Sequence, residues 1–286
     1  GLNQAALKRT PGRRRLLSFF ARRRPSSQGA PMSLKGRVVP LPSAADRARA
    51  GRSEAREEAL EIFRAGLEAV NRTELAKLDL YVRRRQRALV QRLIQMAEED
   101  PENLLTLTAM RDPTLSPRAH NMMVCIYAIC LGRLLDLSRA SLVRLGMCAL
   151  NHNVGETLLP AELFSVEREL EPAERSRIEQ HPLLGAGHLL RHYGYSSAIV
   201  ERALVAAEHH SHYDGSDSYP FPVGRKQHVF SRIVAVADVF DALCSPRPYR
   251  AAFPPDQAIK LVNRQGGRRL DPVIVRRLLW LVGRYP

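Results

Sequence analysis

The stretch that decides the fold is Ile233-Val234-Ala235-Val236-Ala237-Asp238-Val239-Phe240, an apolar run interrupted by one carboxylate. It lies within a segment, residues 229–244, that the pattern predicts to be a helix. A carboxylate in so apolar a segment must be paired, hydrogen-bonded or bound to a metal, because an isolated charge is very costly to bury. Asp238 is therefore the first candidate for a functional residue.

Two other apolar runs end in histidines. His152-Asn153 follows the run from Leu142 to Leu150, and His209-His210 follows the run from Ile199 to Ala207. One helical histidine alone is more often a structural residue than a ligand. Several imidazoles and a carboxylate at helix ends of one bundle, however, can converge on one or two metal ions. The pattern as a whole therefore predicts a metal site.

The rest of the chain favours an all-α fold. Ser53 is a candidate N-cap, acidic residues fill the turn after it, and Asp100-Pro101 predicts the end of a long helix. No alternating segment competes, apart from a short piece near Val38-Val39. Helices are predicted from Ser53 and over residues 73–99, 117–135, 138–150, 172–191, 195–211, 229–244, 255–265 and 272–283.

The net charge of +15 belongs almost entirely to the N-terminal segment. Residues 1–52 contain thirteen Lys and Arg against one Asp, so this segment carries +12 and the remaining chain about +3. It is also rich in Pro, Ser and Gly, which predicts a disordered basic tail or linker. Two arginine triplets flank a short apolar patch, Leu16 to Ala21. Attachment to an anionic membrane surface or to nucleic acid is thus a second possibility for this tail.

Composition further limits the class of protein. Hydrophobic residues make up 45% of the 286 residues, enough for a core without disulfides. Cys125, Cys130 and Cys148 lie in apolar stretches and are predicted to be buried thiols, which favours a reducing, cytoplasmic location. No apolar run has the length of a bilayer span, so any membrane association is expected to be peripheral. The chain begins at Gly1 without Met, and we expect it to be part of a longer protein.

The order of the polar motifs resembles that of the HD-GYP family. His120 comes first, and the later motifs follow in the family's order over roughly residues 110–286. They are His152-Asn153-Val154-Gly155-Glu156, His181-Pro182-Leu183-Leu184-Gly185, His209-His210-Ser211, Asp214-Gly215-Ser216-Asp217-Ser218-Tyr219-Pro220, Ala237-Asp238-Val239-Phe240-Asp241-Ala242-Leu243, Arg247-Pro248-Tyr249-Arg250 and Leu270-Asp271-Pro272. Composition and the resemblance together predict three parts: the basic tail at 1–52, a helical lead-in at 53–109, and at 110–286 an HD-type helical bundle with extra C-terminal helices.

The resemblance implies a cyclic di-GMP phosphodiesterase with a centre of two or three metals, often iron or manganese. For this chain we expect one or two divalent transition metals. His120, His152 and Asp238 would serve one metal, and His181, His209 and His210 the other, with position 153 between them. Tyr219, Arg247 and Arg250 match positions next to the substrate. Cyclic di-GMP or a related dinucleotide is thus the expected partner, beside signalling proteins.

Four departures fall on residues that the family's reaction needs. Asn153 stands at the position of a bridging Asp, and its amide offers one neutral oxygen where a carboxylate offers two charged ones. Glu156 replaces a Lys, and Ser211 replaces a Glu. The Gly before Tyr219-Pro220 is lost, and that loop gains a residue. If residues 152–156 continue as a helical turn, Glu156 would share a face with His152 and supply the missing anion. His212 would add an imidazole.

Three functions remain open on these grounds. The first is a degenerate domain with impaired phosphodiesterase activity that is kept for ligand sensing or protein interaction. The second is an active cyclic di-GMP phosphodiesterase. The third is a scaffold that its basic tail targets to an anionic membrane or to nucleic acid. The altered residues favour the first function over the second.

Overall fold

The computed structural model describes residues 80–109, 116–166, 168–216, 226–246 and 250–284. The predictions for residues 1–79, including the basic tail, the helix from Ser53 and the short piece near Val38-Val39, lie outside this part. The described residues form helices and no strand, apart from one isolated bridge between Gly266 and Leu270. The predicted all-α fold class is confirmed.

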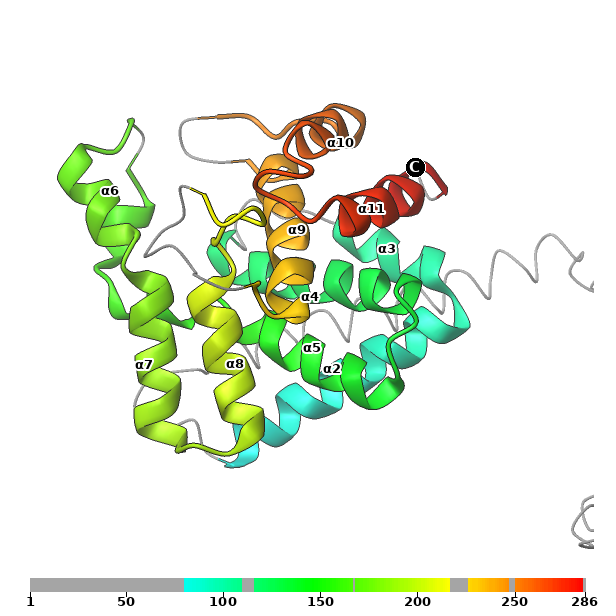
Figure 1. Cartoon of the computed structure of the whole chain (residues 1–286), viewed down its shortest axis with the longest axis horizontal. Helices are drawn as coiled ribbons and strands as arrows, with labels where there is room; N and C mark the ends of the chain where they lie inside the picture. Colours follow the sequence, from blue (N-terminus) through cyan, green and yellow to red (C-terminus); the bar gives the residue numbers. More distant parts are fainter. Residues whose placement is uncertain (1–79, 110–115, 167, 217–225, 247–249, 285–286) are drawn as a thin grey trace, which may run out of the picture. The chain divides into compact units, whose positions relative to one another are not determined.

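Ten α-helices are present in the described part of the chain (Figure 1). They are α2 (Leu80–Glu99), α3 (Pro101–Ala109), α4 (Ser116–Leu134), α5 (Arg139–Asn151), α6 (Pro172–Ile178), α7 (His181–Tyr193), α8 (Ser197–Glu208), α9 (Val229–Cys244), α10 (Pro255–Arg264) and α11 (Pro272–Arg284). Two 3-10 helices, η2 (Val154–Leu158) and η3 (Ala161–Phe164), lie between α5 and α6. None of the described helices has the length and apolarity to cross a membrane.

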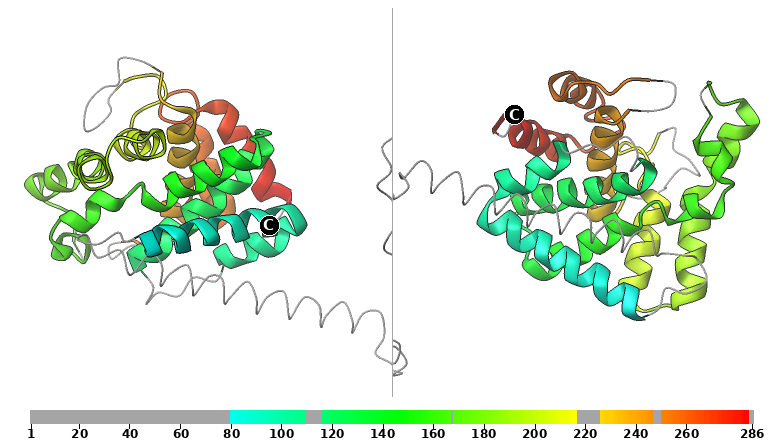
Figure 2. Two further views of the ribbon diagram at one scale, coloured as in Figure 1. Left: turned by 90° about the horizontal axis from the view of Figure 1, so that it is seen from below. Right: turned by 180° about the vertical axis from the view of Figure 1, so that it is seen from behind.

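The helices pack around two apolar clusters. The larger cluster joins α2, α3, α4, α5, α9, α10 and α11, and α4 has its most extensive contacts with α5 and α9. The smaller cluster lies between η2, α7 and α8. Helices α7 and α8 run side by side (Figures 1 and 2). Cys125, Cys130 and Cys148 are buried free thiols of the larger cluster, as predicted, and Cys244 is a fourth. The two clusters adjoin where α5 ends and α8 ends.

The single helix predicted over residues 172–191 is wrong, because this segment forms α6 and α7 with a turn at Glu179-Gln180. Pro182 is the physical reason. It has no N–H to donate to the carbonyl of Ile178, so α6 cannot continue through it, whereas the first turn of a helix tolerates a proline. A new helix therefore starts at His181. The helix predicted over 195–211 ends earlier, at Glu208, so His209 and His210 lie just beyond the end of α8.

Two glycines bring η2 and α7 into backbone contact. A Cβ at Gly155 would lie 1.9 Å from the carbonyl oxygen of His181, and a Cβ at Gly185 would lie 2.9 Å from the amide nitrogen of Gly155. Both distances are shorter than any van der Waals contact. The two glycines of separate sequence motifs therefore meet at one crossing, and this crossing holds the start of α7.

We expect Gly155→Ala to destabilise the protein by about 3 kcal/mol, the upper end of the range for overpacking, because the obstructing atoms are backbone rather than flexible side chains. Urea denaturation followed by circular dichroism measures the effect. Gly283→Ala is the matched control, since a Cβ there meets no atom within 4 Å. Equal stability of the Gly155→Ala variant and the wild type would contradict the crossing.

Candidate metal centre

Six of the predicted metal-binding residues lie in two groups of three. In each group the possible ligand atoms all lie within 4.8 Å of one another. One group joins residues of α4, α9 and the end of α5, and the other joins the start of α7 with the end of α8. The groups are His120, His152 and Asp238, and His181, His209 and His210.

The first group is built around two carboxylates of α9. The Nε2 atom of His120 lies 2.9 Å from Oδ1 of Asp238, and its Nδ1 atom lies 2.7 Å from Oδ2 of Asp241. The Nε2 atom of His152 lies 3.7 Å from Asp238, too far for a hydrogen bond. Asp238 therefore lies between two imidazoles, and Asp241 orients one of them from behind.

The second group adjoins the first. The Nε2 atoms of His181 and His209 are 3.2 Å apart, and the rings of His209 and His210 have centroids 4.0 Å apart. The ring centroid of His152 is 5.0 Å from that of His209. The six residues thus form one continuous cluster with room for two neighbouring ligand sets.

Helix ends orient three of the histidines. The Nδ1 atoms of His152, His181 and His209 lie 2.7, 2.8 and 2.8 Å from main-chain carbonyl oxygens of residues 149, 178 and 206, three positions earlier in each case. These carbonyls belong to the last turns of α5, α6 and α8, where no helical N–H is available to them. Because a carbonyl only accepts, each Nδ1 carries the proton. Each Nε2 then presents a lone pair to the cluster.

The sequence produces this anchoring by ending a helix one to three residues before each histidine. For His181 the cause is Pro182, which leaves the carbonyl of Ile178 without a main-chain donor. That carbonyl accepts from the imidazole instead. For His152 and His209 the helices end at the preceding residue. A hydrogen bond at one ring nitrogen that fixes the other as a ligand is a general feature of metal-binding histidines.

His120 in the first group differs in protonation from His209 and His210 in the second. Burial opposes protonation of His120, but the hydrogen bonds with Asp238 and Asp241 outweigh it and raise the pKa of His120 to about 10. Burial lowers the pKa of His209 well below its ordinary value and that of His210 to about 3. Histidine binds a metal only when neutral. His209 and His210 are thus ready to bind, whereas a metal at the first group must displace the proton of His120.

Several buried polar atoms around the cluster support a fit to metal. Within the described residues, His152 Nε2, Asn153 Oδ1 and Ser211 Oγ are buried and make no hydrogen bond. Leaving such an atom unsatisfied costs about 1–3 kcal/mol, so native proteins rarely tolerate several together without a bound ion or water. The residues present therefore fit a metal at His120, His152 and Asp238. The three imidazoles of His181, His209 and His210 also fit a second metal, at a site with no carboxylate of its own.

Asn153 and Ser211 are buried beside the cluster, but the helical turn on which compensation by Glu156 depended is not formed. Asn153 is 6% exposed, immediately after His152. Residues 154–158 form a 3-10 helix rather than a continuation of α5, so Glu156 does not share a helical face with His152. Its charge acts instead on His181, whose pKa burial lowers and Glu156 partly restores. Neither Glu156 nor His212 belongs to either ligand group.

Of the three positions expected to contact the substrate, the structure describes only Arg250. Tyr219 and Arg247 lie outside the described residues. The guanidinium of Arg250 donates to the carbonyls of Ala242 (2.9 Å), Leu243 (3.2 Å) and Ala251 (2.8 Å). It also lies over the ring of Phe253, 4.5 Å from its centroid. Arg250 thus caps the C-terminal end of α9 in this structure, where last-turn carbonyls need donors.

Sequence reasoning missed two kinds of residue. Asp241 was not assigned a role, although its spacing of three from Asp238 places both carboxylates on one side of α9. Arg175 and Arg269 were also missed. They line a pocket beside His210, and no local pattern distinguishes them from the chain's many exposed arginines.

The described residues form an all-helical domain with two groups of histidine and aspartate side chains that could hold metal ions. The HD domain family model matches residues 87–274, two thirds of the chain, and the chain belongs to this family. The motif-based recognition of an HD-GYP-type member is confirmed by the relatives that follow.

Curated relatives are named for cyclic dinucleotide hydrolysis. A cyclic di-GMP phosphodiesterase of Pseudomonas aeruginosa is 30% identical over 65% of this chain and 44% of its own length. A cyclic di-GMP phosphodiesterase response regulator of Xanthomonas campestris is 37% identical over 51% of this chain and 38% of its own. A 3'3'-cGAMP-specific phosphodiesterase of Vibrio cholerae is 30% identical over 54% of this chain and 32% of its own. The chain thus spans less than half the length of these relatives.

A solved structure shares the fold. It is described as an HDG"Y"P protein from Bdellovibrio bacteriovorus, with a TM-score of 0.57 and 16% sequence identity over 83% of this chain and 72% of that one. The predicted architecture, an HD-type helical bundle with additional C-terminal helices, is confirmed.

Proposed function

We propose that this chain is an HD-GYP-type domain of cyclic dinucleotide signalling that binds metal and cyclic di-GMP but hydrolyses the dinucleotide far more slowly than intact members. The relatives' names support the ligand class. The observation that carries the impairment is the buried, unpartnered Oδ1 of Asn153 beside His152. Where the family's pattern has a bridging anion, this chain offers a neutral amide.

The six residues are proposed to form two metal sites. His120, His152 and Asp238 would hold one metal, and His181, His209 and His210 the second. Bound metals in such a centre acidify a coordinated water and neutralise charge on phosphoryl oxygens. Asp238 is the one carboxylate among the six residues. Two dications at this cluster would thus be poorly balanced in charge, and we expect the three-imidazole site to bind its metal more weakly.

The metal is proposed to be iron or manganese. A set of two imidazoles and one carboxylate is typical of iron(II) sites, and the carboxylate is also a ligand that suits manganese. The second set, with imidazoles alone, discriminates less between iron and zinc. Protein partners, and contact of the basic tail with an anionic surface, stay predictions.

An active phosphodiesterase is the second candidate, and the complete assembly of six ligands favours it. The test is a side-by-side measurement on manganese-loaded protein of cyclic di-GMP binding, by calorimetry, and of hydrolysis, by chromatography of the products. We expect measurable binding with turnover at least about 100-fold below that of an intact family member, the order of loss seen when one electrostatic contribution is removed. Comparable turnover would establish the active enzyme instead, and an absence of binding would overturn the proposal.

A further inference from the structure

A phosphodiester ligand beside this centre needs cationic groups that reach its oxygens, and two of the positions that the family pattern assigns to such groups, 156 and 250, do not supply them in the described part of the chain. Glu156 carries the opposite charge to the Lys of the family pattern. The guanidinium of Arg250 is engaged by the carbonyls of Ala242, Leu243 and Ala251. Other arginines near the cluster are therefore of interest.

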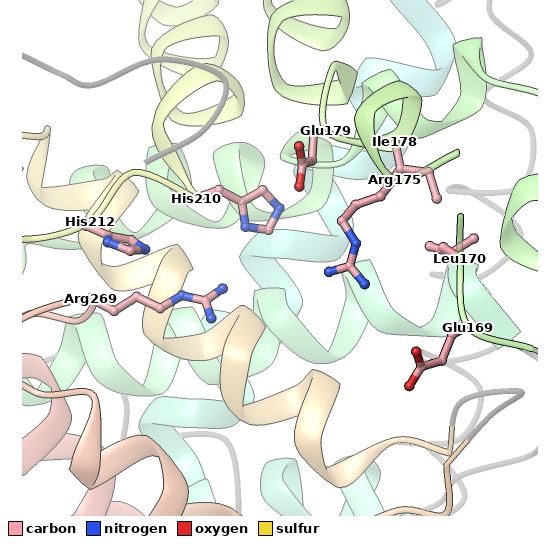
Figure 3. Close-up of a pocket in the computed structure, with 8 residues that line it drawn as sticks. All are labelled: Glu169, Leu170, Arg175, Ile178, Glu179, His210, His212 and Arg269. Atoms are coloured by element: carbon pink, nitrogen blue, oxygen red, sulfur yellow. The ribbon is translucent and has the colours of Figure 1, made fainter. Parts of the chain in front are cut away.

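A pocket of about 450 Å³ opens beside His210. Arg175 enters it from α6 and Arg269 from the loop between α10 and α11. Figure 3 shows their guanidinium groups pointing toward one another from opposite sides, with His210 above the gap between them. A planar guanidinium donates two parallel hydrogen bonds to phosphate oxygens, and two of them facing one another form an anion site.

Main-chain hydrogen bonds hold Arg269 in place. Its carbonyl accepts from the amide of Tyr213 at 3.1 Å, and its own amide donates to the carbonyl of Gln265 at 3.0 Å. The loop after His209-His210 is thereby tied to the loop that carries Arg269. Burial is the largest cause of the lowered pKa of His210, and the positive charge of Arg269 lowers it further. This guanidinium therefore lies close to the second ligand group.

Neither guanidinium is committed to a carboxylate in the described part of the chain. This contrasts with nearby Arg168, which makes a two-pronged ion pair with Glu174 at 2.8 and 2.9 Å. Glu169 and Glu179 also line the pocket but make no ion pair with Arg175 or Arg269. They keep the pocket from being uniformly cationic. A ligand with both phosphate oxygens and N–H donors, such as a guanine nucleotide, suits this lining better than a simple polyanion.

We infer that Arg175 and Arg269 bind a phosphate group of the cyclic dinucleotide and replace the cationic contacts that Glu156 and Arg250 do not provide. This inference rests on the proposed function, because it names residues that recognise the proposed ligand. It assigns the pocket beside His210 to the half of the dinucleotide that extends away from the first ligand group.

The test measures the dissociation constant of cyclic di-GMP by calorimetry on the full, manganese-loaded chain. The variants Arg175→Gln and Arg269→Gln are compared with Arg177→Gln and Arg268→Gln, which remove neighbouring arginines that do not line the pocket. Each pocket variant is expected to weaken binding about tenfold or more, the effect of losing a charge-assisted phosphate contact. The controls are expected to bind within about twofold of wild type, because surface changes away from such contacts matter little. Metal content should be unchanged in all four.

Three outcomes are distinguishable. Selective weakening in the pocket variants supports the inference. Equal affinity in pocket and control variants, with wild-type binding intact, overturns the inference and leaves the proposed function standing. If the wild-type chain binds no cyclic di-GMP, the proposed function fails and the assignment of this pocket fails with it.

Discussion

The double variant Asn153→Asp, Glu156→Lys is expected to hydrolyse cyclic di-GMP at least about 100-fold faster than the wild-type chain. The physical reason is electrostatic, since preorganised charge at a phosphoryl-transfer site is commonly worth two to three orders of magnitude in rate. Aspartate has nearly the shape of asparagine, and the Oδ1 atom of Asn153 is already buried with no hydrogen-bond partner in the described residues. The carboxylate would therefore enter the site without rearrangement. Product chromatography on metal-loaded protein measures the gain.

The control for this gain is Asn153→Ala with Glu156→Lys, which removes the amide without adding an anion. We expect it to stay as slow as the wild type. If it accelerates hydrolysis as much as the aspartate variant does, the missing charge is not the cause of impairment. If the aspartate variant binds two metals per chain and still does not turn over, the loss extends beyond these positions, with Ser211 the next residue to restore.

Replacing Asp238 by Asn is expected to reduce metal content at the first group to a small fraction of the wild-type value. Asp238 is the one carboxylate that belongs to either group, and it lies 2.9 Å from His120. Burial favours its neutral form, but the hydrogen bond from His120 and the charges around it hold its pKa well below the usual range. The anion is therefore present at neutral pH. Removing one partner of a buried ion pair also costs about 3–5 kcal/mol.

Metal analysis after dialysis, together with thermal unfolding with and without added manganese, separates the two effects. Wild-type protein should be stabilised by manganese, because a ligand that binds only the folded state raises its stability, and the variant should lose this response. Asp271→Asn is the matched control. Asp271, just before α11, is similarly buried and pairs with Arg232 of α9, and it belongs to neither ligand group. It should lose stability but keep its metal. Unchanged metal content in the Asp238 variant would contradict the ligand assignment.

The sequence was a good guide where function depends on which residue types recur in which order. The family resemblance assigned two groups of possible metal ligands, and the structure brings the same residues together: His120, His152 and Asp238, and His181, His209 and His210. It failed where the outcome depends on one local detail, as at Pro182, which splits a predicted helix in two. It also could not show where long side chains point. Arg250 matched a substrate-contact position, yet its guanidinium meets the end of α9, while Arg175 and Arg269 belong to no motif.

The anchoring of three imidazoles by helix-end carbonyls has a consequence for how such a domain changes over time. An imidazole held by the main chain keeps its orientation whatever side chains surround it. Individual acids and lysines of the reaction can then be exchanged one at a time without disturbing the remaining ligands. The framework that presents the ligands is in this sense separable from the charges that drive catalysis. On the proposed function, this chain keeps that framework and lacks part of those charges.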